Sequence, residues 1–264
     1  MSAGTALSEV FKRTKRERRV ALIPYITAGH PSLTDLPELV GALNDGGADI
    51  IEIGIPFSDP LADGPVLQKA ATQALNQGVK IRDILSITAD LSAYSVPIVY
   101  LTYFNPVFHF GVRRFLEAAR DSGVRGLIIP DLPWSESGEV FNYTQELGMS
   151  LIPLVAPTST NRHIASLAKA TGFIYGVSVT GVTGVRKDVD SGLKVLVDRV
   201  KQYVSLPLAI GFGISTPEQA SYVGQMADGV IVGSALVRLI DQDRSRASQR
   251  AQEFVASLRQ ALSN

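Results

Sequence analysis

The chain has 264 residues with 25 basic and 25 acidic side chains, so its formal net charge is zero, which argues against binding to nucleic acid or to an anionic membrane. It has no Cys and only three His, which excludes disulfides, thiolate metal sites and Cys nucleophiles, argues against a His-rich metal site, and fits a reducing, cytoplasmic compartment. No apolar run approaches the roughly 18 residues of a membrane span.

The N-terminal stretch 6–19 is basic and allows two interpretations. It has the charge of a targeting segment or a nucleic-acid arm, but it lacks a secretory apolar region and contains two Glu. We expect instead a short amphipathic helix with Leu7, Val10 and Phe11 on one face.

From residue 20 onward, apolar runs of strand length alternate with segments of helical spacing. We expect strands at 20–27, 50–55, 97–102, 126–129, 150–155, 173–178, 207–211 and 229–233. We expect helices at 34–44, 66–75, 81–91, 112–121, 135–147, 161–169, 193–204, 217–223, 235–240 and 247–262.

Most of these strands are continuous apolar runs, which indicates burial on both faces, as in a parallel sheet covered by helices. Eight such units in this length predict an α/β fold, a (β/α)8 TIM barrel with an extra N-terminal helix. A doubly wound open sheet is the alternative. No linker or shift in composition divides the chain, so we expect one domain over residues 1–264.

In such a barrel the active site lies at the carboxyl ends of the strands, and Glu52 lies inside the second strand. Its neighbours on the same face, Ile50 and Gly54, offer no charge to pair with it. Burial should then raise its pKa, which suits a general acid and base near neutral pH. The alternative is a buried ion pair, but no Lys or Arg lies inside a predicted strand.

The loop 59–65 after this strand carries Asp59 and Asp63. A carboxylate on a loop stays ionised until the loop closes over a substrate, and two carboxyl groups in different environments form a recurring acid–base arrangement. Asp63 is therefore the second catalytic candidate. Ordinary turn chemistry is the alternative for both aspartates.

Glycines follow the last two strands, at Gly213 and at Gly233 before Ser234. Glycine lets backbone N–H groups approach an anion, and a helix N-terminus adds unpaired N–H groups. Loops after the seventh and eighth strands of these barrels often bind phosphate. We expect a phosphate site made of backbone, with Gly184 as a third side; the alternative is a pair of tight turns.

Apolar and aromatic residues near the strand ends form the remaining candidate walls of the pocket. They are Tyr25, Leu101, Tyr103, Ile129, Tyr175 and Phe212. Together with a phosphate site they indicate a phosphorylated substrate that carries a flat apolar group. Plain core packing would account for about half of them.

The segment from Glu52 to Pro65, EIGIPFSDPLADGP, resembles the signature of the tryptophan synthase alpha chain family. The resemblance extends over nearly the whole chain. It includes the segments 103–106, 131–133, 181–184, 211–215 and 233–234, and also Tyr175.

This resemblance implies a lyase that cleaves indole-3-glycerol phosphate to indole and glyceraldehyde 3-phosphate. Glu52 would protonate the ring carbon that bears the side chain, and Asp63 would bind the indole N–H. Tyr175 would lie beside Glu52, and Thr183 would hold its loop against the Asp63 loop.

For binding, the resemblance assigns the phosphate to Gly184, Gly213, Gly233 and Ser234. It assigns the indole to Tyr25, Leu101, Tyr103, Ile129 and Phe212.

The resemblance also implies an α2β2 complex with a beta chain that carries pyridoxal phosphate, and no cofactor in this chain. The loop around Asp59 and the segment 103–108 would face that partner, which would receive the indole.

Three alternatives stay open. An isomerase acting on an aminated ribose phosphate would share the phosphate site without needing the segment 52–65. A non-catalytic chain that only activates a partner would lack the two carboxyl groups. A free-standing lyase would release indole as its product.

Overall fold

The computed structural model describes residues 6–177, 186–211 and 213–263. In this part of the chain the strands are β1 (Ala21–Thr27), β2 (Ile51–Gly54), β3 (Ile98–Leu101), β4 (Val124–Ile128), β5 (Ser150–Leu151), β6 (Leu154–Val155), β7 (Ile174–Val177), β8 (Leu208–Gly211) and β9 (Gly229–Val232). All of their pairings are parallel, in the order β5-β4-β3-β2-β1-β9-β8-β7-β6.

The predicted strand 150–155 closes the barrel in two pieces, β5 and β6. Pro153 lies between them and has no N–H to donate to a ladder. The first piece pairs with β4, and Ile152 N donates to Leu127 O at 2.8 Å. The second pairs with β7, and Tyr175 N donates to Pro153 O at 2.9 Å. The predicted (β/α)8 barrel is therefore confirmed.

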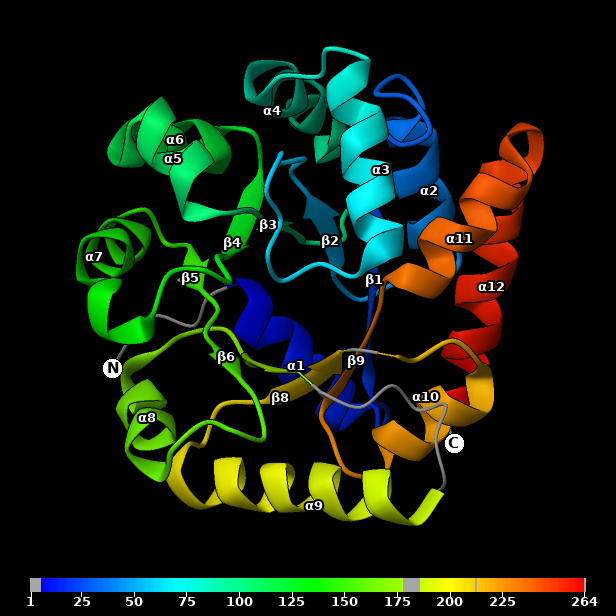
Figure 1. The fold of residues 1–264 in the computed structure, drawn as a ribbon. Coiled ribbons are helices and arrows are strands. Elements are labelled where there is room, and N and C mark those ends of the chain that lie inside the picture. Colours follow the sequence, from blue (N-terminus) through cyan, green and yellow to red (C-terminus); the bar gives the residue numbers. More distant parts are fainter. Residues whose placement is uncertain (1–5, 178–185, 212, 264) are drawn as a thin grey trace.

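Helices surround the strands (Figure 1). They are α1 (Ala6–Arg16), α2 (Leu36–Asp45), α3 (Pro65–Asn76), α4 (Ile81–Ala89), α5 (Phe104–Phe110), α6 (Val112–Asp121), α7 (Gly138–Glu146), α8 (Asn161–Ser166), α9 (Arg186–Tyr203), α10 (Pro217–Gly224), α11 (Ser234–Gln242) and α12 (Ala247–Ala261). Short 3₁₀ turns are η1 (Asp90–Ala93), η2 (Trp134–Glu136), η3 (Leu167–Lys169) and η4 (Arg244–Arg246).

Two helices differ from the sequence-based expectation. The α5 helix was not predicted, and α9 begins at Arg186 rather than at residue 193. The expected helix at the N-terminus is present as α1, with Leu7, Val10 and Phe11 buried.

The α1 helix packs against the barrel interior, inside the ring of helices (Figure 1). Leu7 and Phe11 join the inner core, where the Phe11 and Phe173 rings lie 5.4 Å apart. Successive strand residues face opposite sides, so Ile50 belongs to the inner core while Ile51 belongs to the core under the helices. By this alternation Glu52 faces the interior of the barrel.

One expectation about charge was wrong. Because β4 begins at Val124, two residues before the predicted start, it includes Arg125, a basic residue within a strand. The side chain of Arg125 is exposed. No basic side chain forms a salt bridge with Glu52 among the described residues, so a barrel ion pair does not neutralise it.

A cluster of charges joins both ends of the chain to the start of β2. The Asp49 carboxylate is 3% exposed and accepts from Arg19 at 2.7 and 2.8 Å, from Arg259 at 2.8 Å and from Arg13 at 3.2 Å. These arginines come from α1, the segment before β1 and α12. The cluster precedes the strands, at the barrel end where residues contribute to stability rather than catalysis.

Candidate active site

A cavity of about 420 Å³ brings together residues from the carboxyl ends of several strands. The predicted site residues that line it are Tyr25, Glu52, Asp63, Leu101, Tyr175, Gly213, Gly233 and Ser234. They come from six different strands or the loops that follow them. Residues far apart in the sequence therefore converge on one cavity.

Glu52 is held rigidly at the centre of β2. The strand register places it between Tyr25 of β1 and Val99 of β3. Its side chain is 1% exposed, and its Oε2 atom has no hydrogen-bond partner. Burial, and then the charge of Asp63, raise the pKa of Glu52 from 4.5 to about 8. Glu52 is therefore a neutral acid at pH 7.

Asp63 is half-buried on the loop between β2 and α3. Its N–H donates to Pro60 O at 3.1 Å, and its carbonyl oxygen accepts from Gln68 Nε2 at 2.8 Å. Burial raises the pKa of Asp63 to about 6, while the Tyr103 hydroxyl acts in the opposite direction and lowers it. Between pH 6 and 8 the site thus holds one neutral carboxylic acid and one carboxylate.

Two tyrosines beside these acids occupy space left by glycines on neighbouring strands. A Cβ on Gly54 would fall within 3 Å of the Tyr25 hydroxyl, and a Cβ on Gly211 would fall within 3 Å of the Tyr175 hydroxyl. Burial raises the pKa of both tyrosines far above the ordinary value, and the charge of Asp63 adds to this effect. The two hydroxyls therefore stay protonated and serve as neutral walls.

The cavity also contains the N-terminus of α11. Gly233 is its N-cap, so the N–H groups that follow precede the first helical hydrogen bond, Val237 N to Gly233 O at 3.0 Å. Gly213 has a φ of +73°, which favours glycine, and lines the same cavity. Such free N–H groups at the positive end of a helix bind phosphate.

Arg238 also lines the cavity, although it was not among the residues predicted from the sequence. It lies one turn beyond Ser234 on α11, where side chains four residues apart are neighbours. The i, i+4 spacing was the available signal. Other missed lining residues are apolar: Val66, Leu67, Pro130, Leu154, Val177, Ile214 and Ile231.

Some predicted residues lie elsewhere. Tyr103 is buried under the Asp63 loop, where its hydroxyl accepts from Ala62 N at 3.0 Å. Ile129 lines a neighbouring cavity rather than this one. Thr183, Gly184 and Phe212 lie outside the described residues.

Two other classes of site, a metal cluster and a membrane span, are absent from the described ranges. Nowhere in 6–177, 186–211 and 213–263 do three or more His, Asp or Glu side chains gather as metal ligands. In the same ranges no helix has the length and hydropathy needed to cross a bilayer.

Comparisons with known proteins agree with this geometry. A family model described as "Tryptophan synthase alpha chain" matches residues 11–263. The tryptophan synthase alpha chain of Thermoanaerobacter sp. (strain X514) is 46% identical over 259 residues, covering 97% of this chain and 99% of that protein. That of Synechocystis sp. is also 46% identical, over 262 residues, covering 98% and 99%.

Solved structures give the same result. A chain of Mycobacterium tuberculosis tryptophan synthase superposes with a TM-score of 0.92 at 35% identity, covering 99% of this chain and 100% of that one. The tryptophan synthase alpha chain of Legionella pneumophila superposes with a TM-score of 0.90 at 33% identity, covering 98% of each chain.

Proposed function

Because this chain belongs to the tryptophan synthase alpha chain family, we propose specific roles for its pocket residues in the alpha reaction of that enzyme. The reaction cleaves indole-3-glycerol phosphate to indole and glyceraldehyde 3-phosphate, and it makes this chain a lyase of tryptophan biosynthesis. The roles follow from which groups carry a proton at neutral pH.

Glu52 is the acid that starts the reaction. Its neutral carboxyl group gives a proton to the ring carbon that bears the glycerol phosphate chain. Protonation leaves a positive charge on the indole ring, centred near its nitrogen. The Asp63 carboxylate, with its pKa of about 6, accepts a hydrogen bond from the ring N–H and stabilises that charge.

Cleavage then supplies Glu52 with a second proton, and the first stays on the ring carbon of indole. The bond between the ring carbon and the chain breaks, and its electron pair restores the aromatic ring. The chain carbon becomes an aldehyde as its hydroxyl proton passes to the Glu52 carboxylate. One proton leaves Glu52 and one comes back, so the acid is regenerated for the next turnover.

The N-terminus of α11 and Gly213 bind the phosphate through backbone N–H groups, and Arg238 adds a positive charge beside them. Tyr25, Leu101 and Tyr175 enclose the indole. The resemblance adds Gly184 to the phosphate contacts, Phe212 to the indole contacts, and Thr183 to the closure of the Asp63 loop.

The partner is the tryptophan synthase beta chain, in an α2β2 complex that receives the indole. Two large apolar side chains support an interface: Leu61 is 82% exposed on the Asp63 loop, and Phe108 is 65% exposed on α5. The hydrogen bond from Ala62 N to Tyr103 links these two segments. A partner that covers them would order the loop that carries Asp63. Pyridoxal phosphate belongs to the beta chain, and this chain needs no cofactor of its own.

A single observation carries this assignment: a neutral buried acid and an ionised carboxylate line one cavity with a helix N-terminus. The test is an assay of indole release from indole-3-glycerol phosphate, with and without a purified beta chain. Glu52→Gln should abolish release and keep glycerol 3-phosphate binding, whereas the exposed control Glu139→Gln on α7 should match the wild type.

Turnover retained by Glu52→Gln would contradict its role. A rise in rate on adding the beta chain, together with co-elution, supports the complex. Full activity alone, without co-elution, would favour the free-standing lyase.

A further inference from the structure

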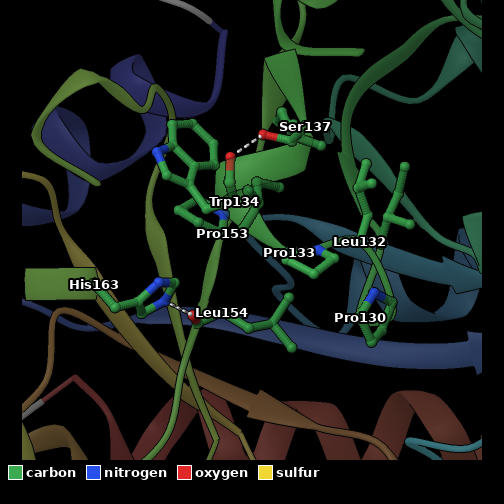
Figure 2. A pocket seen from close by; sticks show the side chains of 11 residues that line it. Pro130, Leu132, Pro133, Trp134, Ser137, Pro153, Leu154 and His163 are labelled. Atoms are coloured by element: carbon green, nitrogen blue, oxygen red, sulfur yellow. Dashed lines mark hydrogen bonds between the residues drawn. The ribbon is translucent and has the colours of Figure 1, made fainter. Parts of the chain in front are cut away.

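A second cavity of about 170 Å³ lies beside the substrate pocket, with which it shares Pro130 and Leu154. Figure 2 shows the side chains that line this second cavity. It is formed where β4 ends, between η2, the β5–β6 strand and α8. Nine of its eleven lining residues are apolar or proline side chains, and Ser137 and His163 are the other two. None of the eleven is an acid, a Lys or an Arg. The cavity therefore suits a neutral molecule.

Its aromatic wall is fixed before any ligand arrives. Trp134 Nε1 donates to Ser166 O at 3.1 Å, and the Trp134 ring meets Phe141 edge-on with centroids 5.2 Å apart. Three prolines, Pro130, Pro133 and Pro153, add rigid backbone to the lining. A preformed flat wall loses little entropy on binding a flat ligand.

The polar groups of the lining are left as acceptors. His163 Nε2 lies 3.2 Å from Leu154 O. A carbonyl oxygen only accepts, so Nε2 carries a hydrogen, and in the tautomer with its hydrogen on Nε2 the Nδ1 atom is an acceptor. The Ser137 hydroxyl donates to Trp134 O at 2.9 Å and keeps lone pairs on its oxygen. An aromatic ligand with one N–H donor matches this set.

The size of the cavity restricts the ligand further. An engineered apolar cavity of about 150 Å³ holds one benzene, so a space of about 170 Å³ holds one small aromatic molecule but no phosphate chain. Pro130 and Leu154 line both this cavity and the substrate pocket. The second cavity thus shares a wall with the site where a neutral aromatic product forms.

We propose that this cavity is a separate binding site for free indole, the product released in the adjoining pocket. The proposal rests on the proposed function for the identity of the ligand. His163 accepts the indole N–H, and Trp134 packs against the ring. Indole held there no longer occupies the substrate pocket, which leaves Glu52 and Asp63 free for the next substrate.

The single Trp of the chain makes the test specific. In a ¹H–¹⁵N spectrum of the labelled full-length chain, Trp134 Nε1–H gives the only indole resonance. The substrate pocket is first saturated with indole-3-propanol phosphate, which has the ring and phosphate of the substrate but no hydroxyls on its chain. Unlabelled indole is then titrated. We expect a saturable shift of the Trp134 resonance.

Two variants separate this site from non-specific binding. Leu132→Phe adds a ring to the cavity lining and should abolish the shift, whereas Val195→Phe on the exposed face of α9 should keep it, and both variants leave Trp134 as the single Trp. His163→Phe keeps a ring but removes the acceptor, and should raise the Kd for indole roughly fivefold. The exposed control His109→Phe should bind as the wild type does.

The proposal is overturned if indole leaves the Trp134 resonance unchanged in the saturated chain, or if the resonance of Leu132→Phe shifts as much as that of the wild type. These outcomes are independent of catalysis. A chain that releases no indole from substrate, yet shows the saturable shift, would contradict the proposed function and keep this site. A chain that releases indole from substrate but shows no shift of the Trp134 resonance would support the proposed function and overturn this site.

Discussion

Replacing Glu52 by Gln should remove catalysis and at the same time stabilise the fold. Glu52 is fully buried, and its Oε2 atom has no hydrogen-bond partner. The folded protein therefore holds this group in its neutral form, while the unfolded chain lets it ionise in water. Gln is neutral in both states and has nearly the same shape, so the substitution removes the cost of keeping the proton.

The size of the effect follows from the pKa, which rises from 4.5 to about 8 on folding. Between these values the folded state binds one proton more than the unfolded state, so the stability of the wild type falls as the pH rises. One pKa unit corresponds to about 1.4 kcal/mol. Keeping the proton on Glu52 therefore lowers the folding stability of the wild type by about 3 kcal/mol at pH 7 and by less than about 1 kcal/mol at pH 5.

Urea unfolding of the wild type and Glu52→Gln at pH 5, 6, 7 and 8 measures this difference directly. We expect the variant to gain on the order of 3 kcal/mol at pH 7, which is a rise in Tm of roughly 6–12 °C for a chain of this size. The gain should shrink toward pH 5. Equal stability of the two proteins at every pH would refute the claim that burial holds the proton on Glu52.

Three further changes test other parts of the molecule. Asp63→Asn should lower kcat at least ~100-fold, or about 3 kcal/mol of transition-state stabilisation; a mild loss would limit Asp63 to closure of its loop. Arg238→Gln should raise KM about tenfold and leave kcat nearly unchanged, with Arg238→Lys restoring part of the affinity; an unchanged KM would exclude a phosphate contact. Asp49→Ala should destabilise the fold by about 3 kcal/mol because it removes the buried carboxylate shared by the half-buried Arg19 and Arg259, while the exposed control Glu9→Ala should leave stability nearly unchanged; the folded Asp49→Ala variant should keep its turnover.

The apolar run at residues 50–55 was sufficient to predict that Glu52 lies inside a buried strand. A continuous apolar run has strand length, and its period of two sets which residues share the inner face. Its raised pKa also followed, because the neighbours on that face carry no charge. The magnitude did not follow, since it includes the charge of Asp63, which the loop brings near in space.

The same period explains why Ile129 was assigned to the wrong cavity. Ile128 belongs to the inner core of the barrel, and Ile129 belongs to the core under the helices. A shift of one residue in a strand reverses the face of the side chain. The alternation within the predicted strand 126–129 therefore places Ile128, and not Ile129, toward the interior of the barrel.

The α5 helix, which was missed, and the first residues of α9, which was predicted too short, lack the apolar periodicity that predicts a helix. In α5, Pro106 lies in the first turn, where its missing N–H costs nothing, and the N–H of Phe104 donates to Asp131 Oδ1 at 2.9 Å. That contact joins residues far apart in the sequence. The first residues of α9, from Arg186 to Gly192, are mostly polar or glycine.

The most direct test of joint action by Glu52 and Asp63 is the pH dependence of kcat/KM for indole release from indole-3-glycerol phosphate, because kcat/KM reports the pKa values of the free chain. The claim is that a neutral Glu52 and an ionised Asp63 act together. We expect a bell-shaped profile whose limbs lie near pH 6 and pH 8, and Asp63→Asn should lose the acid limb. A rate that keeps rising above pH 8 would contradict it, because the active form of Glu52 would then be the carboxylate.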